Sequence, residues 1–474
     1  MRAFDLGLAG YVLNSSVSEY TYDVLLDTYM GGVLPVAKTE EQRACAQAAA
    51  ARTLVGPLTR ALEDEGSERA YFDIDLPLVA VLAIMERTGA AIDVERLAQL
   101  GASTGEEIEG LRTQIFELAG QEFNADSPKQ LGHILFEVLG LPARKKIPAR
   151  VFHRRQGCSK TLPRSTSCPP LCCAIASWRR SSPPTSTRCR VCAPATGACI
   201  PASTTVTTTR APVLIRIPNL AEHVPVRTQF GRHIRECFVP LEPGCKFLSA
   251  DYSQIELRLL AHLSGDEALI QAFTSGADFH ASTASRVFDV PIEQVTPEQR
   301  SRAKAVNFGI VYGQQAFGLA QSLGISIAEA KGMIDRYFEV HPGVRAYLDE
   351  TVEQARANGY AQTMFGRKRH IPELRAANGN TRGFGERTAM NHPMQGTAAD
   401  IIKIAMARVS RRLEEEGFAA HMILQVHDEL DFECPIDEVE RLTAMVQDVM
   451  EHVVDLRVPL IAEASTGITW ADAK

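Results

Sequence analysis

The chain has 474 residues, 45% of them apolar and 23% charged, a composition typical of a globular protein of roughly two to four domains. Its formal net charge of −7 excludes a strongly basic chain, so any site for a polyanion must come from a local cluster of basic residues. No apolar run approaches the roughly 18 residues of a membrane span, and Asp5 lies where a signal peptide would be apolar. We therefore expect a cytoplasmic protein.

Residues 1–145 have the spacing of turn residues expected of a folded region, and they predict a mixture of helices and strands. Within them, residues 71–93 are apolar with a regular period, and residues 106–120, EEIEGLRTQIFELAG, predict an amphipathic helix.

Residues 146–217 differ from the rest of the chain. They show no sustained period and are rich in Ser, Thr, Pro, Arg and Cys. Seven of the chain's eleven cysteines lie here: Cys158, Cys168, Cys172, Cys173, Cys189, Cys192 and Cys199.

Three interpretations of this segment are open. A zinc site could use Cys168, Cys172, Cys189 and Cys192, but their spacing is a weak match to that of metal ligands. Disulfides would fit the number of cysteines but not a cytoplasmic compartment. We favour the third, out-of-frame translation of a GC-rich coding sequence, which would enrich these residue types and leave the segment disordered.

The stretch KFLSADYSQIELRLLAHLS, residues 246–264, predicts a strand that leads into a helix. Asp251 lies where the strand ends, so its carboxylate should reach the edge of a sheet. A second carboxylate from a neighbouring strand could join it there to hold a divalent metal ion.

The second carboxylate comes from MILQVHDELDFE, residues 422–433, which alternates like one half-buried strand with Asp428 in its apolar row. A bare carboxylate facing a core would cost several kcal/mol. Two close carboxylates repel unless a cation lies between them, so we expect Asp428 and Asp251 to share Mg²⁺. The alternative is that Asp251 caps the following helix and Asp428 lies in a hairpin turn.

A helix is predicted from TPEQRSRAKAVNFGIVYG, because Thr296 can cap it and Gln299 completes a capping box. Steps of four drift only about 40° around a helix, and they align two cations and then two aromatic side chains: Arg300, Lys304, Phe308 and Tyr312. This order suits a nucleoside triphosphate lying along the helix. A solvated basic end that runs into an aromatic core would give the same pattern.

Residues 364–409 supply the local positive charge that the totals lack. The basic residues are Arg367, Lys368, Arg369, Arg375, Arg382 and Arg387, in what we expect to be loops rich in Gly and Asn that contact a phosphate backbone. Arg387, Asn391 and Gln395 again fall at steps of four and could read a duplex minor groove. A plain solvated surface is the alternative.

Three of these stretches together resemble the motifs of the family A DNA polymerases, the DNA polymerase I type. DYSQIELR at 251–258 is similar to the first palm motif, RAKAVNFGIVYG at 302–313 to the fingers helix, and VHDE at 426–429 to the third motif. The likeness extends over most of the chain apart from residues 146–217.

The resemblance implies an α+β fold of right-hand architecture, in which an antiparallel palm sheet is joined by helical fingers and a helical thumb. It also implies a remnant of an exonuclease-like α/β domain, and it places Asp428 at a hairpin tip, against the reading of one continuous strand. The resemblance implies five parts in chain order. Residues 1–70 would be an inactive 3′ to 5′ exonuclease-like remnant and residues 71–240 the thumb region. The first part of the palm would be residues 241–280, the fingers residues 281–385 and the second part of the palm residues 386–474. Residues 146–217 would be an aberrant part of the thumb.

The resemblance also implies roles at the reacting end of the substrate. Asp251 and Asp428 would bind two Mg²⁺ ions, with Glu429 as a supporting carboxylate. Glu256 would crowd the sugar 2′ position and reject ribonucleotides.

Along the fingers helix, Arg300 and Lys304 would contact phosphates, Phe308 the incoming nucleotide and Tyr312 the template-side pocket. The residues implied to hold the primer-template are Arg387, Asn391, Gln395 and His427.

These roles would make the chain a template-directed DNA polymerase that adds deoxynucleotides to a primer 3′-hydroxyl, in replication or repair, as a monomer. We expect no proofreading, because the early exonuclease carboxylates are missing and residues 45–54, CAQAAAARTL, lack the expected Tyr and Asp. We also expect no 5′ nuclease domain. One alternative is a noncatalytic remnant that binds primer-template weakly through a broken thumb, and a weaker one is a two-metal nuclease.

Overall fold

A computed structural model describes residues 3–17, 19–125, 127–139, 229–276 and 278–474. It also describes the two-residue strands β2 (Ala198–Cys199), β3 (Ser203–Thr204) and β4 (Leu214–Ile215). The other predictions for residues 146–217, including those for its cysteines, lie outside the described residues. No helix among the described residues is long and apolar enough to cross a membrane.

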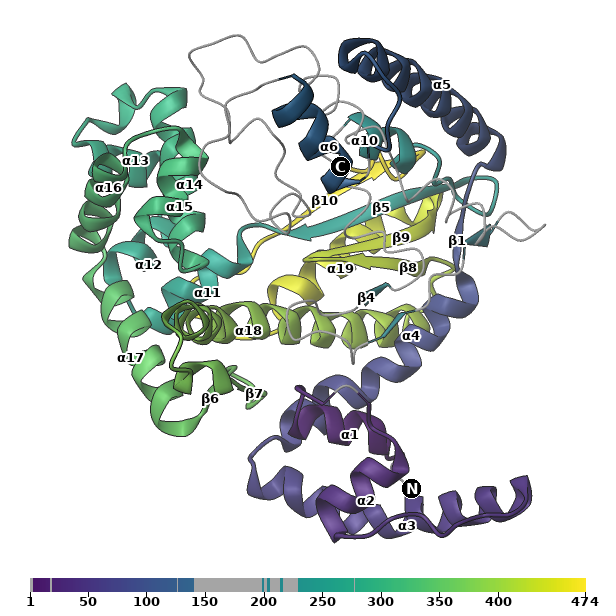
Figure 1. Ribbon diagram of the computed structural model, residues 1–474. Helices are drawn as coiled ribbons and strands as arrows, with labels where there is room; N and C mark the ends of the chain where they lie inside the picture. The colour runs from purple at the N-terminus through teal and green to yellow at the C-terminus, as the bar shows by residue number, and fades with distance from the viewer. Residues whose placement is uncertain are drawn as a thin grey trace.

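Residues 3–88 form a helical unit at the bottom of the view in Figure 1. Its elements are α1 (Leu6–Leu13), α2 (Tyr22–Met30), α3 (Glu40–Asp64), the π-helical turn η1 (Ala70–Asp75) and α4 (Leu76–Thr88). Leu54, Leu58 and Leu62 recur every four residues on α3 and are fully buried against α1 and α2. The predicted mixture of helices and strands is almost entirely helical, because β1 (Ala90–Ala91) is the only strand described within residues 3–139.

The amphipathic helix predicted at residues 106–120 is part of the longer α5 (Val94–Ala119), which Asp93 caps by accepting a hydrogen bond from the amide of Arg96. After it come α6 (Pro128–His133), the π-helical turn η2 (Ile134–Val138) and α10 (Gln229–Arg235). Figure 1 shows α5, α6 and α10 above one end of the central sheet.

The central sheet is antiparallel, in the order β10-β5-β9-β8. Its strands are β8 (His421–Val426), β9 (Glu429–Pro435), β10 (Ala462–Gly467) and β5 (Cys245–Tyr252). Side chains alternate between faces, so Leu248 and Ala250 of β5 and Leu430 and Phe432 of β9 pack into one core with α18 and α19. The opposite face carries the polar set: Ser249, Asp251, Glu429, Asp431 and Glu433.

The continuous strand predicted over residues 422–433 was wrong. A turn at His427 and Asp428 separates β8 from β9, and His427 adopts a left-handed conformation with φ 59°. A bulge between Met422 and Leu424 also shifts the alternation, so Met422 faces the α18 side and Leu424 faces the other side. Period two alone could not reveal either break.

A group of helices covers the other end of the sheet, drawn at the left of Figure 1. It comprises α11 (Ile255–Ser264), α12 (Glu267–Thr274), α13 (Phe279–Phe288), α14 (Pro297–Val311), α15 (Ala316–Leu323), α16 (Ile327–Val340) and α17 (Pro342–Asn358), with the short 3₁₀ turn η5 (Ile292–Gln294). Leu257, Ile310 and Tyr337 lie in their shared core.

The long helix α18 (Gly379–Glu415) runs beneath the sheet. It follows the hairpin of β6 (Tyr360–Gln362) and β7 (Lys368–His370) and the 3₁₀ turn η6 (Pro372–Arg375), and it precedes β8; the 3₁₀ turn η7 (Ile436–Glu438) and α19 (Val439–Glu451) follow β9. The prediction of basic loops was therefore wrong for Arg382 and Arg387, which lie on α18.

Arg367 also differs from the prediction, because it is buried in an ion-pair network and does not face solvent. Its guanidinium donates to Asp75 at 2.7 and 2.9 Å and to Asp400 at 2.7 Å. Lys403 donates to Asp75 at 2.8 Å, and all four side chains are buried. Each charge is paired, as a buried charge must be, and the network joins η1 to α18 and the β6–β7 hairpin.

Candidate active site

Asp251 and Asp428 lie together at one end of the polar face of the sheet. Asp251 is on β5 opposite Glu429 of β9, and the amide of Tyr252 donates to the carbonyl oxygen of Asp428 at 3.1 Å. Asp251 does not cap the following helix, because the N-cap of α11 is Gln254. Asp428 does lie in a hairpin turn, as the alternative held.

The two carboxylates repel one another in a partly buried site. Burial raises the pKa of Asp428 to about 7, and the charge of Asp251 adds to this shift. Burial likewise raises the pKa of Asp251, while the nearby ammonium of Lys474 opposes the rise. Both groups therefore gain from a cation placed between them.

The oxygen atoms available at this site fit a hard divalent cation. Oδ1 of Asp251 is buried and accepts no hydrogen bond within the described residues. Carboxylate oxygens are the ligands that Mg²⁺ takes in proteins, usually from one or two side chains with water and substrate phosphates completing the shell. The described part of the chain contains no group of three or more metal-ligating side chains.

Glu429 is held by several protein donors, whereas Oδ1 of Asp251 accepts no hydrogen bond among the described residues. Its side chain is 1% exposed and accepts hydrogen bonds from Ser249 Oγ at 2.9 Å, from Trp470 Nε1 at 3.2 Å and from Lys474 Nζ. Arg235 Nη1 lies 3.6 Å from Glu429 Oε1. These partners were not predicted from the sequence. The alternation of ELDFE, which puts the carboxylates of Glu429, Asp431 and Glu433 on one face of β9, is the signal that could have pointed to them.

Asp431 belongs to the same row and is fully buried opposite Ser249. Burial, with the charge of Glu429, holds its pKa well above the usual range. The carboxylates of β9 thus form a buried polar column behind Asp251.

The predicted row of two cations and two aromatic side chains lies on α14 and at its end, and we call it the stripe: Arg300, Lys304, Phe308 and Tyr312. Thr296 and Gln299 form the predicted capping box. Arg300 and Lys304 are exposed, and Phe308 stacks on Tyr312 with ring centres 6.4 Å apart. Tyr312 is the C-cap residue and so lies at the end of the helix.

The two cations of the stripe differ in their surroundings. Arg300 Nε donates to Asp278 at 2.7 Å across an exposed pair, and surface pairs of this kind are weak. Lys304 forms no ion pair with a carboxylate among the described residues, so its exposed ammonium is available to a ligand phosphate.

Glu256 joins α11 to the end of α14. Its carboxylate hydrogen-bonds with the hydroxyl of Tyr312, and burial raises the pKa of Glu256. The pair lies close enough to the carboxylates for Asp428 to act on the pKa of Tyr312. The structure therefore brings the stripe and the carboxylate pair to one site.

The residues predicted to contact the primer-template lie beside the end of α14. Arg387, Asn391 and Gln395 are all half-buried on α18, and Asn391 Oδ1 accepts no hydrogen bond in the described parts of the chain. Gly313, with φ +62°, passes so close to α18 that a Cβ there would lie 3.1 Å from Cγ of Arg387. His427 is exposed in the β8–β9 turn.

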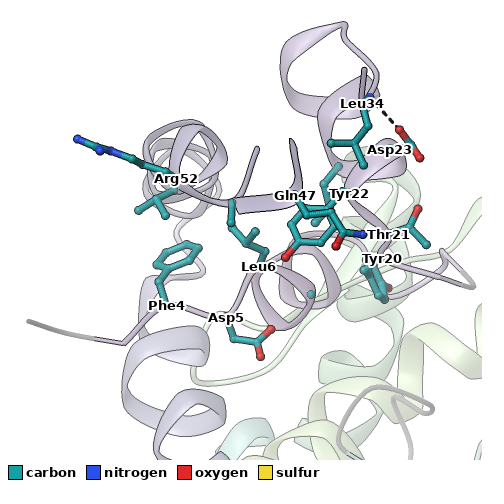
Figure 2. A pocket seen from close by; sticks show the side chains of 14 residues that line it. Phe4, Asp5, Leu6, Tyr20, Thr21, Tyr22, Asp23, Leu34, Gln47 and Arg52 are labelled. Atoms are coloured by element: carbon teal, nitrogen blue, oxygen red, sulfur yellow. Dashed lines mark hydrogen bonds between the residues drawn. The ribbon is translucent and has the colours of Figure 1, made fainter. Parts of the chain in front are cut away.

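A cavity lies elsewhere, among α1, α2 and α3. It has a volume of about 710 Å³ and is lined by residues that include Phe4, Tyr22 and Arg52. Figure 2 shows these side chains together with Leu34, whose amide donates to Asp23 at 2.9 Å. None of the predicted site residues lines it, so we locate the chemistry at the sheet.

Comparison with known proteins shows similarity over nearly the whole chain. The DNA polymerase I of Geobacillus stearothermophilus is 44% identical over 432 residues, which are 90% of this chain and 49% of that protein. The DNA polymerase I of Caldicellulosiruptor bescii is 40% identical over 474 residues, which are 99% of this chain and 55% of that protein. The chain thus spans about half the length of the curated relatives it matches.

A solved structure extends the likeness to three dimensions. The POL domain of Pol1 from M. smegmatis, in complex with DNA primer-template and dNTP, is 36% identical with a TM-score of 0.91, over 99% of this chain and 82% of that chain. This match confirms the expected α+β polymerase fold. The family model described as DNA polymerase family A matches residues 94–472. The chain therefore belongs to DNA polymerase family A.

Proposed function

We propose that this chain is a template-directed DNA polymerase that adds deoxynucleotides to the 3′-hydroxyl of a primer. The observation that carries the proposal is the meeting of Asp251 and Asp428 at the end of the sheet, near Tyr312. Tyr312 ends α14, the helix that also carries the exposed cations Arg300 and Lys304. A nuclease would need the carboxylates but not the nucleotide-sized stripe. The family of the chain and its likeness to a polymerase in complex with primer-template and dNTP support the same activity.

Asp251 and Asp428 would hold two Mg²⁺ ions. When bound, these ions activate the primer 3′-hydroxyl and neutralise charge on the triphosphate and the leaving pyrophosphate. The buried, unpartnered Oδ1 of Asp251 supports this assignment. Glu429 would act as a support, because its buried contacts fix the strand that carries the hairpin.

Lys304 and Arg300 would bind the phosphates of the incoming nucleotide. Lys304 is free to do so, whereas Arg300 must exchange Asp278 for a phosphate oxygen. Phe308 would pack on the nucleotide, and Tyr312 would line the template-side pocket. Glu256 would exclude a sugar 2′-hydroxyl, and its hydrogen bond with Tyr312 would hold the Glu256 carboxylate in place.

The primer-template would lie against α18 and the β8–β9 turn. The half-buried Arg387, Asn391 and Gln395 and the exposed His427 offer hydrogen-bonding groups there. We assign residues 241–280 and 386–474 to the palm and residues 281–385 to the fingers.

Residues 71–240 would form the thumb region and residues 1–70 an inactive exonuclease-like part without proofreading. The proposal includes a monomer acting in the cytoplasm, where a bacterial cell keeps its DNA. The bacterial sources of the relatives support this location.

Primer extension tests the function directly. The full chain is incubated with a recessed duplex, Mg²⁺ and four deoxynucleotides, beside Asp428→Asn and a control, Asp349→Asn, at an exposed carboxylate on α17. We expect template-directed extension by the wild type and the control, and a loss of at least about 10²-fold in Asp428→Asn.

Two results would contradict the proposal. A folded wild-type protein that binds primer-template without extending it would be a noncatalytic remnant. Shortening of the primer without nucleotides, lost in Asp428→Asn, would make the site that of a nuclease.

A further inference from the structure

Lys474 lies between two carboxylates of the candidate active site. Its Nζ atom donates to Glu429 Oε2 and lies 3.5 Å from Asp251 Oδ2. The side chain of Glu429 is 1% exposed and that of Asp251 is 38% exposed. The ammonium thus links a buried carboxylate to one that opens toward the substrate side.

The residues before Lys474 set its position. Trp470 is fully buried, its Nε1 donates to Glu429 at 3.2 Å, and the guanidinium of Arg235 lies 3.7 Å from its ring centre. Ala473 is also buried and its amide donates to the carbonyl of Thr469 at 3.3 Å. The lysine therefore extends from a packed turn.

The turn also packs tightly on the end of β10. A Cβ at Gly467 would lie 2.5 Å from the backbone carbon of Asp472 and 2.6 Å from the amide nitrogen of Ala473. The backbone before Lys474 thus lies directly against the end of β10.

The ammonium leaves one oxygen of Asp251 free. Oδ2 lies near Lys474, whereas Oδ1 is buried and accepts no hydrogen bond from the residues described. A cation bound to Oδ1 would lie a few ångströms from the ammonium. Positive charges at that separation repel strongly in a partly desolvated site.

We propose that Lys474 is a positioning residue that serves as a built-in counter-cation. It holds Asp251 and Glu429 together in the metal-free site and lowers the affinity of that site for a free divalent cation. Metal is then retained when the negative triphosphate joins the two carboxylates. This inference rests on the proposed function, because it takes Asp251 and Asp428 as the metal ligands.

Binding of Mn²⁺ alone, without DNA or nucleotide, tests the inference by electron paramagnetic resonance on the full chain. The variants are Lys474→Met, Lys474→Arg and the matched control Lys331→Met, at a lysine 71% exposed on α16. Asp251→Asn identifies the Mn²⁺ that belongs to this site. Unfolding temperatures show that each variant is folded.

We expect Lys474→Met to bind this Mn²⁺ about tenfold more tightly than the wild type, because one repelling charge is gone. Lys474→Arg keeps the charge and should bind as the wild type does, and Lys331→Met should change nothing. In primer extension, the Mg²⁺ concentration that gives half the maximal rate should fall in Lys474→Met only.

Unchanged or weaker Mn²⁺ binding in Lys474→Met would overturn the role of Lys474 and leave the polymerase proposal intact. Tighter binding in Lys474→Arg as well would also overturn it, since charge would not be the cause. If Asp251→Asn removes no bound Mn²⁺, the metal lies elsewhere, and both this inference and the metal assignment fail.

Discussion

The amide of Tyr252 donates a hydrogen bond to the carbonyl oxygen of Asp428 at 3.1 Å, one step beyond the register pair of Asp251 and Glu429. The hairpin tip is thus fixed to β5 through the backbone. This backbone contact does not involve the Asp428 carboxylate. Glu429 differs, because its carboxylate accepts from several donors.

This difference predicts opposite effects on stability. In the presence of chelator, Asp428→Asn should unfold at the wild-type temperature or above it, since one of two repelling charges is removed. Glu429→Gln should lose about 1–3 kcal/mol, because buried donors lose a charged acceptor. Thermal and urea unfolding measure both, and an equal loss in the two variants would contradict the assignment.

Lys304→Met should weaken nucleotide use. The ammonium is exposed on α14, and a hydrogen bond to a charged group contributes about 1.5–3 kcal/mol, so kcat/KM for a deoxynucleotide should fall about 10- to 100-fold. Steady-state extension with varied nucleotide measures this. Arg302→Met, which removes a cation paired with Glu298 on the same helix, is the control. A similar loss in both variants would argue against the stripe.

Tyr312→Phe should relax sugar selection. Without the hydroxyl, the carboxylate of Glu256 loses the partner that holds it, and ribonucleotides should be used more readily relative to deoxynucleotides. Glu256→Ala should have the larger effect, because it removes the obstructing side chain itself. The ratio of kcat/KM for the two sugars is the measurement, and an unchanged ratio in Glu256→Ala would refute this role.

His427→Gly separates a backbone role from a DNA contact. Glycine accepts the φ of 59° without the left-handed strain, so the free energy of unfolding should stay within about 1 kcal/mol of wild type. Affinity for primer-template should fall, measured by fluorescence anisotropy. His452→Asn, at an exposed histidine after α19, should leave affinity unchanged. Full affinity in His427→Gly would show that the imidazole makes no DNA contact.

Asp75→Asn should destabilise the protein and change its acid sensitivity. Breaking a buried ion pair costs about 3–5 kcal/mol. Arg367 and Lys403 overcome burial and lower the pKa of Asp75 from 3.8 to about 2. This stabilisation is complete above pH 3.8 and is lost as pH falls through about 2. The unfolding free energy of Asp75→Asn should therefore lack this part of the acid dependence. Urea unfolding at several pH values measures it, and the prediction fails if the free energies of the variant and the wild type fall in parallel as pH is lowered.

Neighbouring residues in the sequence determined much of the local structure. The capping box of Thr296 and Gln299, the strand that ends near Asp251 and the helix after it were all predictable, because capping and periodic burial act within a few residues. The left-handed turn at His427 was not predictable from alternation, since it depends on how β8 and β9 pair.

Tertiary structure decided what the charged groups do. Arg367 meets Asp75 across 292 positions, and Ser249 meets Glu429 across 180. Nothing in the sequence indicates that Arg367 is buried. Nothing in it indicates that the side chain of Lys474 reaches Asp251 either. The physical reason is that desolvation and charge pairing depend on distances in space, which packing of the whole chain sets.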